Sequence, residues 1–130
     1  MPAGEGNGMD GRFGSTVRIL RTKKGIGLRK FAKQVGISPT YLSKIERGEF
    51  PPPAEDKVVA IADALEQDHD ELLALSGRIA TELKQVILRA PKEFGSLLRM
   101  ADGLRGDGLA QLSQAAEKLR AKPAGRSAKA

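Results

Sequence analysis

Residues 28–48 read LRKFAKQVGISPTYLSKIERG, and this stretch decides the fold. Its apolar residues first recur at helical spacing, until Gly36 interrupts them; glycine accepts the left-handed backbone of a tight turn. Ser38 followed by Pro39 then starts a second helix, because serine caps helix N-termini well and proline loses no hydrogen bond at the first helical position. The pattern predicts two short helices, the second over residues 39–47, joined by a tight turn.

The flanking sequence predicts three more short helices around this pair. Apolar residues at helical spacing indicate a helix over residues 13–24, and after the three prolines at 51–53 another runs through residues 58–65. Asp68 and the glutamate three residues later have the spacing of a capping box, which opens a last helix that a glycine ends. No segment alternates with the two-residue period of a strand. Residues 12–77 are therefore predicted to form an all-α domain of five helices.

The rest of the chain divides into three segments. Residues 1–11 are rich in glycine and residues 122–130 are basic, and both are predicted to be disordered. Residues 78–121 predict two or three amphipathic helices, whose apolar faces need a covering surface from a second copy, another protein or the same chain. The candidate dimerisation residues are Ile79, Leu83, Val86, Phe94, Leu97, Leu98, Leu109 and Leu112.

The charged residues are segregated along the sequence. The net charge of the 130 residues is +6, but residues 11–50 hold ten basic and two acidic residues, whereas residues 51–77 hold one basic and seven acidic residues. This division indicates one face suited to a polyanion and another that repels it. Charge blocks are also common on ordinary solvated surfaces, so the nucleic-acid interpretation needs a motif in support.

The composition excludes most catalytic and metal chemistry. The chain has no cysteine and one histidine, so disulfides, thiolate zinc sites and cysteine nucleophiles are ruled out. That histidine, His69, is expected to be a solvated residue at a helix start rather than a metal ligand. No residues have the spacing of a catalytic site, and no apolar run is long enough to span a membrane. We predict a cytoplasmic protein that is not an enzyme and needs no cofactor.

The second helix of the central pair carries the residues that suit nucleic acid. Leu42 and Ile45 fall on the side that faces the core, which leaves polar and basic residues on the outer side. A protruding helix N-terminus fits the major groove of DNA, which is about 12 Å wide, and its free N–H groups attract phosphate.

Residues 13–77 resemble the XRE-type helix-turn-helix family, which includes the Cro and CI repressors of phages. The resemblance covers about half of the chain. It rests on the order and spacing of Val17, Leu20, Arg21, Gly25, Leu28, Phe31, Ala32, Gly36, Ile37, Ser38, Tyr41, Leu42, Ser43, Ile45, Glu46, Gly48 and the helix over residues 60–65. It implies a five-helix lambda-repressor-like domain that binds double-stranded DNA as a dimer on a pseudo-palindromic operator.

The resemblance also implies roles for individual residues. Those placed to contact base edges are Ser38, Pro39, Thr40, Ser43 and Lys44. Those placed to contact phosphates are Lys23, Lys24, Arg29, Lys30, Tyr41 and Arg47. Ser38 is equally a helix cap, and Tyr41 equally a packing residue. Arg21 and Glu46 are implied to form a partly buried structural salt bridge. Many relatives have glutamine where this chain has Leu28, so Arg29 or Lys30 would replace that phosphate contact.

The sequence thus predicts a sequence-specific transcriptional regulator, a repressor that acts as a homodimer at the nucleoid. One alternative is an antitoxin that binds a toxin through its C-terminal helices and represses its own operon. A strongly acidic C-terminal segment would favour it, whereas residues 78–121 hold eight basic and five acidic residues. The other alternative is an architectural DNA-binding protein with little sequence preference.

Overall fold

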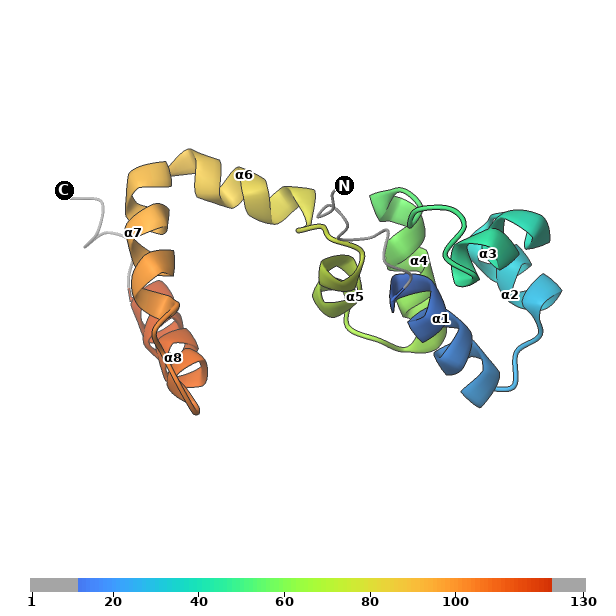
Figure 1. The fold of residues 1–130 in the computed structure, drawn as a ribbon. Helices are drawn as coiled ribbons and strands as arrows, with labels where there is room; N and C mark the ends of the chain where they lie inside the picture. The colour runs from blue at the N-terminus through green and yellow to red at the C-terminus, as the bar shows by residue number, and fades with distance from the viewer. Residues whose placement is uncertain (1–11, 123–130) are drawn as a thin grey trace. The chain divides into compact units, whose positions relative to one another are not determined.

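A computed structural model describes residues 12–122, and over this span the chain forms helices and no strand (Figure 1). The helices are α1 (Arg12–Lys23), α2 (Leu28–Val35), α3 (Pro39–Glu46), α4 (Glu55–Leu65), α5 (His69–Leu75), α6 (Thr81–Arg89), α7 (Pro91–Ala101) and α8 (Gly108–Arg120). The all-α prediction is confirmed. The two segments predicted to be disordered lie outside the described residues, apart from Lys122.

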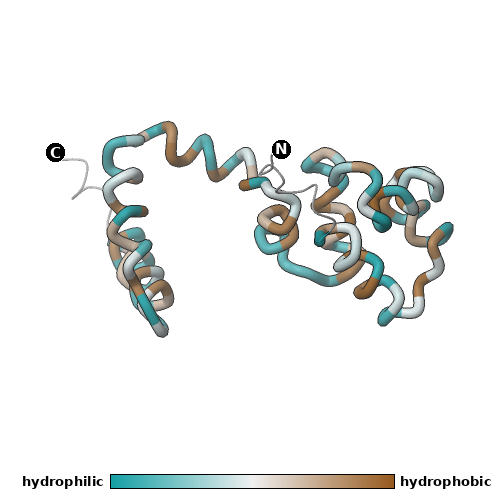
Figure 2. Tube along the Cα trace, in the orientation of Figure 1, coloured by the Kyte–Doolittle hydropathy of each residue, from teal (hydrophilic) through white to brown (hydrophobic). Residues whose placement is uncertain are grey.

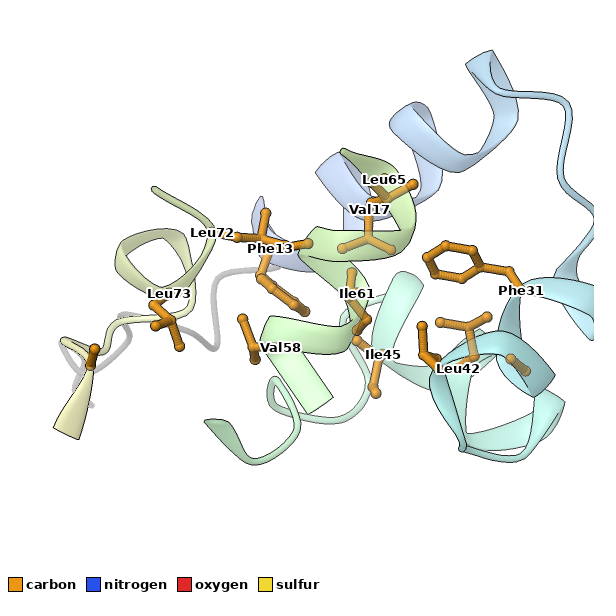
Figure 3. Close-up of a cluster of buried hydrophobic side chains, with 14 residues drawn as sticks. Phe13, Val17, Phe31, Leu42, Ile45, Val58, Ile61, Leu65, Leu72 and Leu73 are labelled. Carbon is orange, nitrogen blue, oxygen red and sulfur yellow. The ribbon is translucent and has the colours of Figure 1, made fainter. Parts of the chain in front are cut away.

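The first five helices share one apolar core. Helix α4 packs against α1, α2 and α5, and α3 packs against α1 and α2. The side chains that fill the space between them are almost fully buried (Figure 3). The largest are Phe13, Phe31, Leu42, Ile45, Ile61, Leu65 and Leu73. Each such side chain contributes about 1.5–3 kcal/mol through its removal from water, so this core holds the central helix pair in place.

Local interactions fix the starts of α3 and α5 and the end of α2, as the sequence predicts. The hydroxyl of Ser38 accepts a hydrogen bond from the Tyr41 N–H at 3.0 Å, and the Asp68 carboxylate accepts one from the Glu71 N–H at 2.9 Å. Gly36 has a φ of 78°, the left-handed conformation that lets the chain turn from α2 into α3. The turn between α2 and α3 and the first residue of α3 therefore follow from short-range interactions.

The backbones of α1 and α3 touch at Gly14. A Cβ atom built on this glycine would lie 2.0 Å from the carbonyl oxygen of Ile45, which no side chain could tolerate without moving one helix. A glycine inside a helical pattern can signal such a close approach. The contact of Gly14 is not predictable from the sequence, because Ile45 lies far away along the chain.

Contacts divide the chain after Lys84, within α6, whereas the sequence predicts a division after Gly77. We call residues 12–84 the N-terminal unit and residues 85–122 the C-terminal unit. The start of α6 belongs to the N-terminal unit because Thr81 donates to the Glu55 carboxylate from its N–H at 3.2 Å and from its hydroxyl at 2.7 Å. These hydrogen bonds lower the pKa of Glu55.

The C-terminal unit has no buried residue among those described. Along α7 and α8 apolar residues recur between polar ones (Figure 2), as expected of helices with one apolar face. Exposed apolar side chains within this unit are Leu88, Leu97, Leu98, Met100, Leu104, Leu109 and Leu119. None of the described helices is long and apolar enough to cross a bilayer.

Candidate nucleic-acid interface

Helix α3 has one buried face and one accessible face. Leu42 and Ile45 are 0% and 1% exposed, and they anchor the helix in the core. On the other side Thr40 is exposed, and Ser43 and Lys44 are half-buried. Of the other residues predicted to contact bases, Ser38 is exposed and Pro39 half-buried. All five therefore have surface that a ligand could reach.

A hollow of about 300 Å³ lies beside the accessible face of α3. It is lined by Leu28, Arg29, Pro39, Thr40, Ser43 and Arg47. A second hollow shares three of these residues, and its lining adds Arg18 and Arg21 of α1 and Glu46, the partner of Arg21. Cationic side chains around an apolar residue suit the sugar–phosphate backbone of a nucleic acid.

Arg18 is a functional candidate that the sequence analysis missed. It is exposed, and it lines the second hollow together with Ser43 and Arg47 of the α3 region. Its position three residues before Arg21 was the available signal, since residues three apart lie on the same face of a helix.

An ion pair ties α1 to α3. Arg21 donates from Nε to Glu46 Oε2 and from Nη2 to Glu46 Oε1, both at 2.8 Å, and from Nη1 to the carbonyl of Ile26 at 2.9 Å. The two charged side chains are only 12% and 4% exposed. The hydrogen bonds with Glu46 raise the pKa of Arg21. The pair implied by the family resemblance is thus present, and it joins α1 to the end of α3.

A second group of charges lies at the C-terminal end of α3. Arg47 donates to the Glu49 carboxylate from Nε at 2.8 Å and from Nη2 at 3.3 Å, and its Nη1 lies 2.6 Å from the hydroxyl of Ser43. The hydrogen bonds from Arg47 lower the pKa of Glu49. Glu49 was given no role from the sequence, because its part depends on how the chain turns after the helix.

Phe50 positions two of the predicted DNA contacts. The Lys44 ammonium lies 5.4 Å from the centre of the Phe50 ring, within the range of a cation–π interaction, and 3.9 Å from Glu49 Oε1. The ring of Tyr41 lies 5.9 Å from the same phenyl ring in a tilted arrangement. Tyr41 therefore packs on an aromatic neighbour while it stays half-exposed.

The remaining predicted phosphate contacts differ in whether they already have a partner. Lys24 pairs with Glu66 at 2.9 Å, and this hydrogen bond lowers the pKa of Glu66. Lys23, Arg29 and Lys30 are exposed, and no ion pair within residues 12–122 involves them.

His69 lies at the start of α5 and pairs with an exposed carboxylate. Its Nε2 lies 2.6 Å from Asp63 Oδ1 on the surface, and this hydrogen bond raises the pKa of the imidazole. Within residues 12–122 no three histidine, cysteine, aspartate or glutamate side chains gather closely enough to hold an ion.

This fold, a packed five-helix unit with a tight turn between α2 and α3, is that of a helix-turn-helix domain. The family model described as "Helix-turn-helix domain" matches residues 12–75. The chain is 36% identical over 60 residues to the HTH-type transcriptional regulator SlrR of Bacillus subtilis, a stretch that covers 46% of this chain and 40% of SlrR. This chain thus spans less than half of the length of SlrR. Residues 12–75 therefore form a helix-turn-helix domain similar to those of XRE-type transcriptional regulators.

Solved structures that are similar to about half of this chain include a regulator and a controller protein. One is SinR, a master regulator for biofilm formation, in complex with DNA; it is 28% identical, and the match covers 47% of this chain and 97% of that one, with a TM-score of 0.44. The other is the restriction-modification controller protein C.AhdI of Aeromonas hydrophila; it is 32% identical, and the match covers 46% and 89% of the two chains, with a TM-score of 0.43.

Proposed function

We propose that this chain binds double-stranded DNA in a sequence-specific manner by placing α3 in the major groove. The observation that carries the proposal is the division of α3 into two faces. Leu42 and Ile45 fix the helix in the core, while Thr40, Ser43 and Lys44 stay accessible. Thr40 and Ser43 line a hollow that also contains two arginines. A helix held this rigidly presents its side chains to base edges with little loss of freedom on binding.

Base reading falls to the outer side chains of α3. Lys44 is a cation that can only donate hydrogen bonds, so it suits the O6 and N7 acceptors of guanine. Its contact with the Phe50 ring limits the positions that the ammonium can take. Thr40 offers a hydroxyl that pairs with more than one base. Ser38 spends an acceptor lone pair on its helix cap, so its part is chiefly to fix the start of α3.

Phosphate contacts supply the sequence-independent part of the affinity. Arg29 and Lys30 lie on α2, where the glutamine of many relatives is replaced by Leu28, and Arg29 lines the same hollow as Thr40. Each phosphate neutralised adds about 0.9 to the slope of log affinity against log salt concentration. We expect Lys23, Tyr41 and Arg47 to add contacts on either side.

We further propose that the protein is a repressor that acts as a homodimer through its C-terminal helices. Leu88 is 71% exposed, and no described side chain of the C-terminal unit is buried. Helices this short are marginal in water without a covered apolar face, so a second copy would complete them. A dimer would span two half-sites about 34 Å apart on the cytoplasmic DNA.

A selection of bound duplexes from a random pool tests the proposed function. We expect an enriched consensus with two-fold symmetry and half-sites one helical turn apart. An enriched consensus without two-fold symmetry would contradict the proposed dimer. The absence of any consensus would leave only an architectural DNA-binding role.

Light scattering of a chain that ends at Lys84 tests the role of the C-terminal unit. The full chain should have the mass of a dimer and the shortened chain that of a monomer. A shortened chain that still dimerises would contradict this role. Isolation of the native protein with a second small protein on its C-terminal helices would favour the antitoxin function instead.

A further inference from the structure

Ser43 stands at the centre of the accessible face of α3, and its hydroxyl already has one partner. Arg47 Nη1 lies 2.6 Å from Ser43 Oγ, and a guanidinium can only donate. The serine oxygen is therefore the acceptor in this contact. A hydroxyl has one proton to donate and two lone pairs to accept with, so one of the two lone pairs is occupied.

The hydroxyl proton of Ser43 has to point away from Arg47, because the cation offers no acceptor. Within residues 12–122 no hydrogen bond is donated by Ser43 Oγ. The hollow of about 300 Å³ is lined by apolar groups, two arginines and the hydroxyl of Thr40, and no carboxylate lines it. The carboxylate that lines the second hollow, Glu46, accepts hydrogen bonds from Arg21. The proton of Ser43 is thus available to a molecule that enters the hollow.

Glu49 holds Arg47 in the position that produces this polarity. Two guanidinium nitrogens of Arg47 donate to the Glu49 carboxylate, at 2.8 Å and 3.3 Å, which leaves Nη1 directed at Ser43. A guanidinium is planar and its donors form a fixed fork, so fixing two of them also fixes the third. Glu49 follows α3 after the turn at Gly48, whose φ of 76° brings the carboxylate back beside the helix.

We infer that Arg47, held by Glu49, makes Ser43 a hydrogen-bond donor toward DNA, so that the base opposite Ser43 is selected against cytosine. This inference rests on the proposed function and names the chemistry that one position of α3 reads. In the major groove guanine, adenine and thymine each present an acceptor, through N7, O6 or O4, whereas cytosine presents only its N4 amino donor. The second lone pair of Ser43 Oγ is open, but the Arg47 cation beside it disfavours the approach of another donor. A serine without that cation would tolerate cytosine by accepting from its amino group.

Lys44 strengthens the same preference at the neighbouring base. An ammonium has three donors and no acceptor, so it also disfavours the cytosine edge. Ser43 and Lys44 together present donors only, and the strand that they face should be rich in bases with acceptor edges, above all guanine. Arg47 and Glu49 are positioning residues in this account and need not touch the base.

The test measures the affinity for four duplexes that differ only at the base pair opposite Ser43. The duplex is the one enriched from the random pool, and the base pair is the position at which the preference of the Ser43→Ala variant changes. We expect the wild type to bind the duplex with cytosine opposite Ser43 about tenfold more weakly than the duplex with guanine there. A difference of this size is in line with the discrimination that one good contact gives. Equal affinity of the wild type for the cytosine and guanine duplexes would overturn the inference.

Three variants separate positioning from simple charge. Arg47→Ala should weaken binding to all four duplexes and reduce the cytosine penalty to less than about threefold, because the freed serine accepts as well as donates. Glu49→Gln should reduce the penalty partly, since Arg47 loses its anchor. Arg29→Ala is the matched control: it removes an arginine of the same hollow that does not contact Ser43, so binding should weaken while the full penalty remains.

The outcomes distinguish this inference from the proposed function. An unchanged cytosine penalty in Arg47→Ala overturns the inference and leaves the proposed function intact. Arg47 is half-exposed, so its loss leaves the core untouched, and circular dichroism checks that each variant is folded. If the random pool yields no consensus for the wild type, it is the proposed function that fails.

Discussion

The two units of this chain use the same kind of sequence pattern with different results. In the N-terminal unit the amphipathic helices cover one another, and their apolar side chains form one buried core. In the C-terminal unit the helices are equally amphipathic, yet no described residue is buried. Helical periodicity therefore specifies which face is apolar, but not what covers it. In the N-terminal unit the cover is internal, and for the C-terminal unit we propose a second copy.

Among single substitutions, we expect the largest loss of folding stability from a change at Gly14. Gly14→Ala would place a methyl group against the Ile45 carbonyl, so α1 and α3 must separate, at a cost of about 3 kcal/mol or more. Gly95→Ala, in the C-terminal unit, is the matched control, since its methyl group would meet only the flexible end of Arg99 at 3.3 Å. Because Gly95 lies in the C-terminal unit, this variant should leave the unfolding of the N-terminal unit unchanged.

Urea unfolding followed by tyrosine fluorescence measures this difference. Tyr41 is the only tyrosine and the chain has no tryptophan, so the signal reports on the N-terminal unit alone. Equal midpoints for Gly14→Ala and the wild type would show that the two helices are not in backbone contact.

The buried ion pair should give the next largest effect. Glu46→Gln removes the charge that Arg21 faces and should destabilise the N-terminal unit by about 2–3 kcal/mol, because a charge with little access to water loses its partner. Glu66→Gln is the matched control, because it removes the exposed partner of Lys24, and exposed pairs contribute little. If both variants shift the urea midpoint equally, burial of the Arg21 pair is not what stabilises it.

Charges on the apolar faces of the C-terminal unit should leave the N-terminal unit unchanged. In Leu97→Glu combined with Leu98→Glu we expect the Tyr41 transition to stay within about 0.5 kcal/mol of the wild type, since exposed positions tolerate substitution. The same variant should have the mass of a monomer by light scattering. A large shift of the Tyr41 transition would mean that the two units share a core, which would remove the contrast between them.

The smallest expected effect is on the pH dependence of stability. The pKa of His69 is raised in the folded state by its hydrogen bond to Asp63, so the protonated form is favoured. The stabilisation is complete below the ordinary histidine pKa of about 6.5 and is lost as the pH rises through the raised folded-state value. The thermal midpoint of the wild type should fall more between pH 6 and 9 than that of Asp63→Asn. Parallel curves for the two proteins would assign the pH dependence to another group.

Local interactions explain how much of the fold the sequence could predict. The Ser38 cap, the Asp68 cap and the glycine turn at Gly36 act within four residues, so their signals are visible in short windows of sequence. Gly14 and Ile45 meet only after the core has formed. The sequence shows a glycine within a helical pattern, but it does not show that Ile45 is the residue that approaches it.

The candidate site shows the same limit. Residue types and helical spacing were enough to predict that Thr40 and Lys44 remain accessible. They could not predict that Glu49 would hold Arg47 against Ser43, because that contact depends on the direction of the chain after Gly48. Side-chain partners around the helix, rather than the helix itself, are what required the structure.

The most direct test of the account compares Lys44→Ala with Arg29→Ala on the selected duplex and on duplexes with single base changes. Lys44→Ala should relax the preference at one base pair of each half-site by about 1–3 kcal/mol, whereas Arg29→Ala should weaken binding to every duplex alike and lower the salt slope by about one. If Lys44→Ala leaves every base preference unchanged, α3 does not read DNA in the orientation proposed.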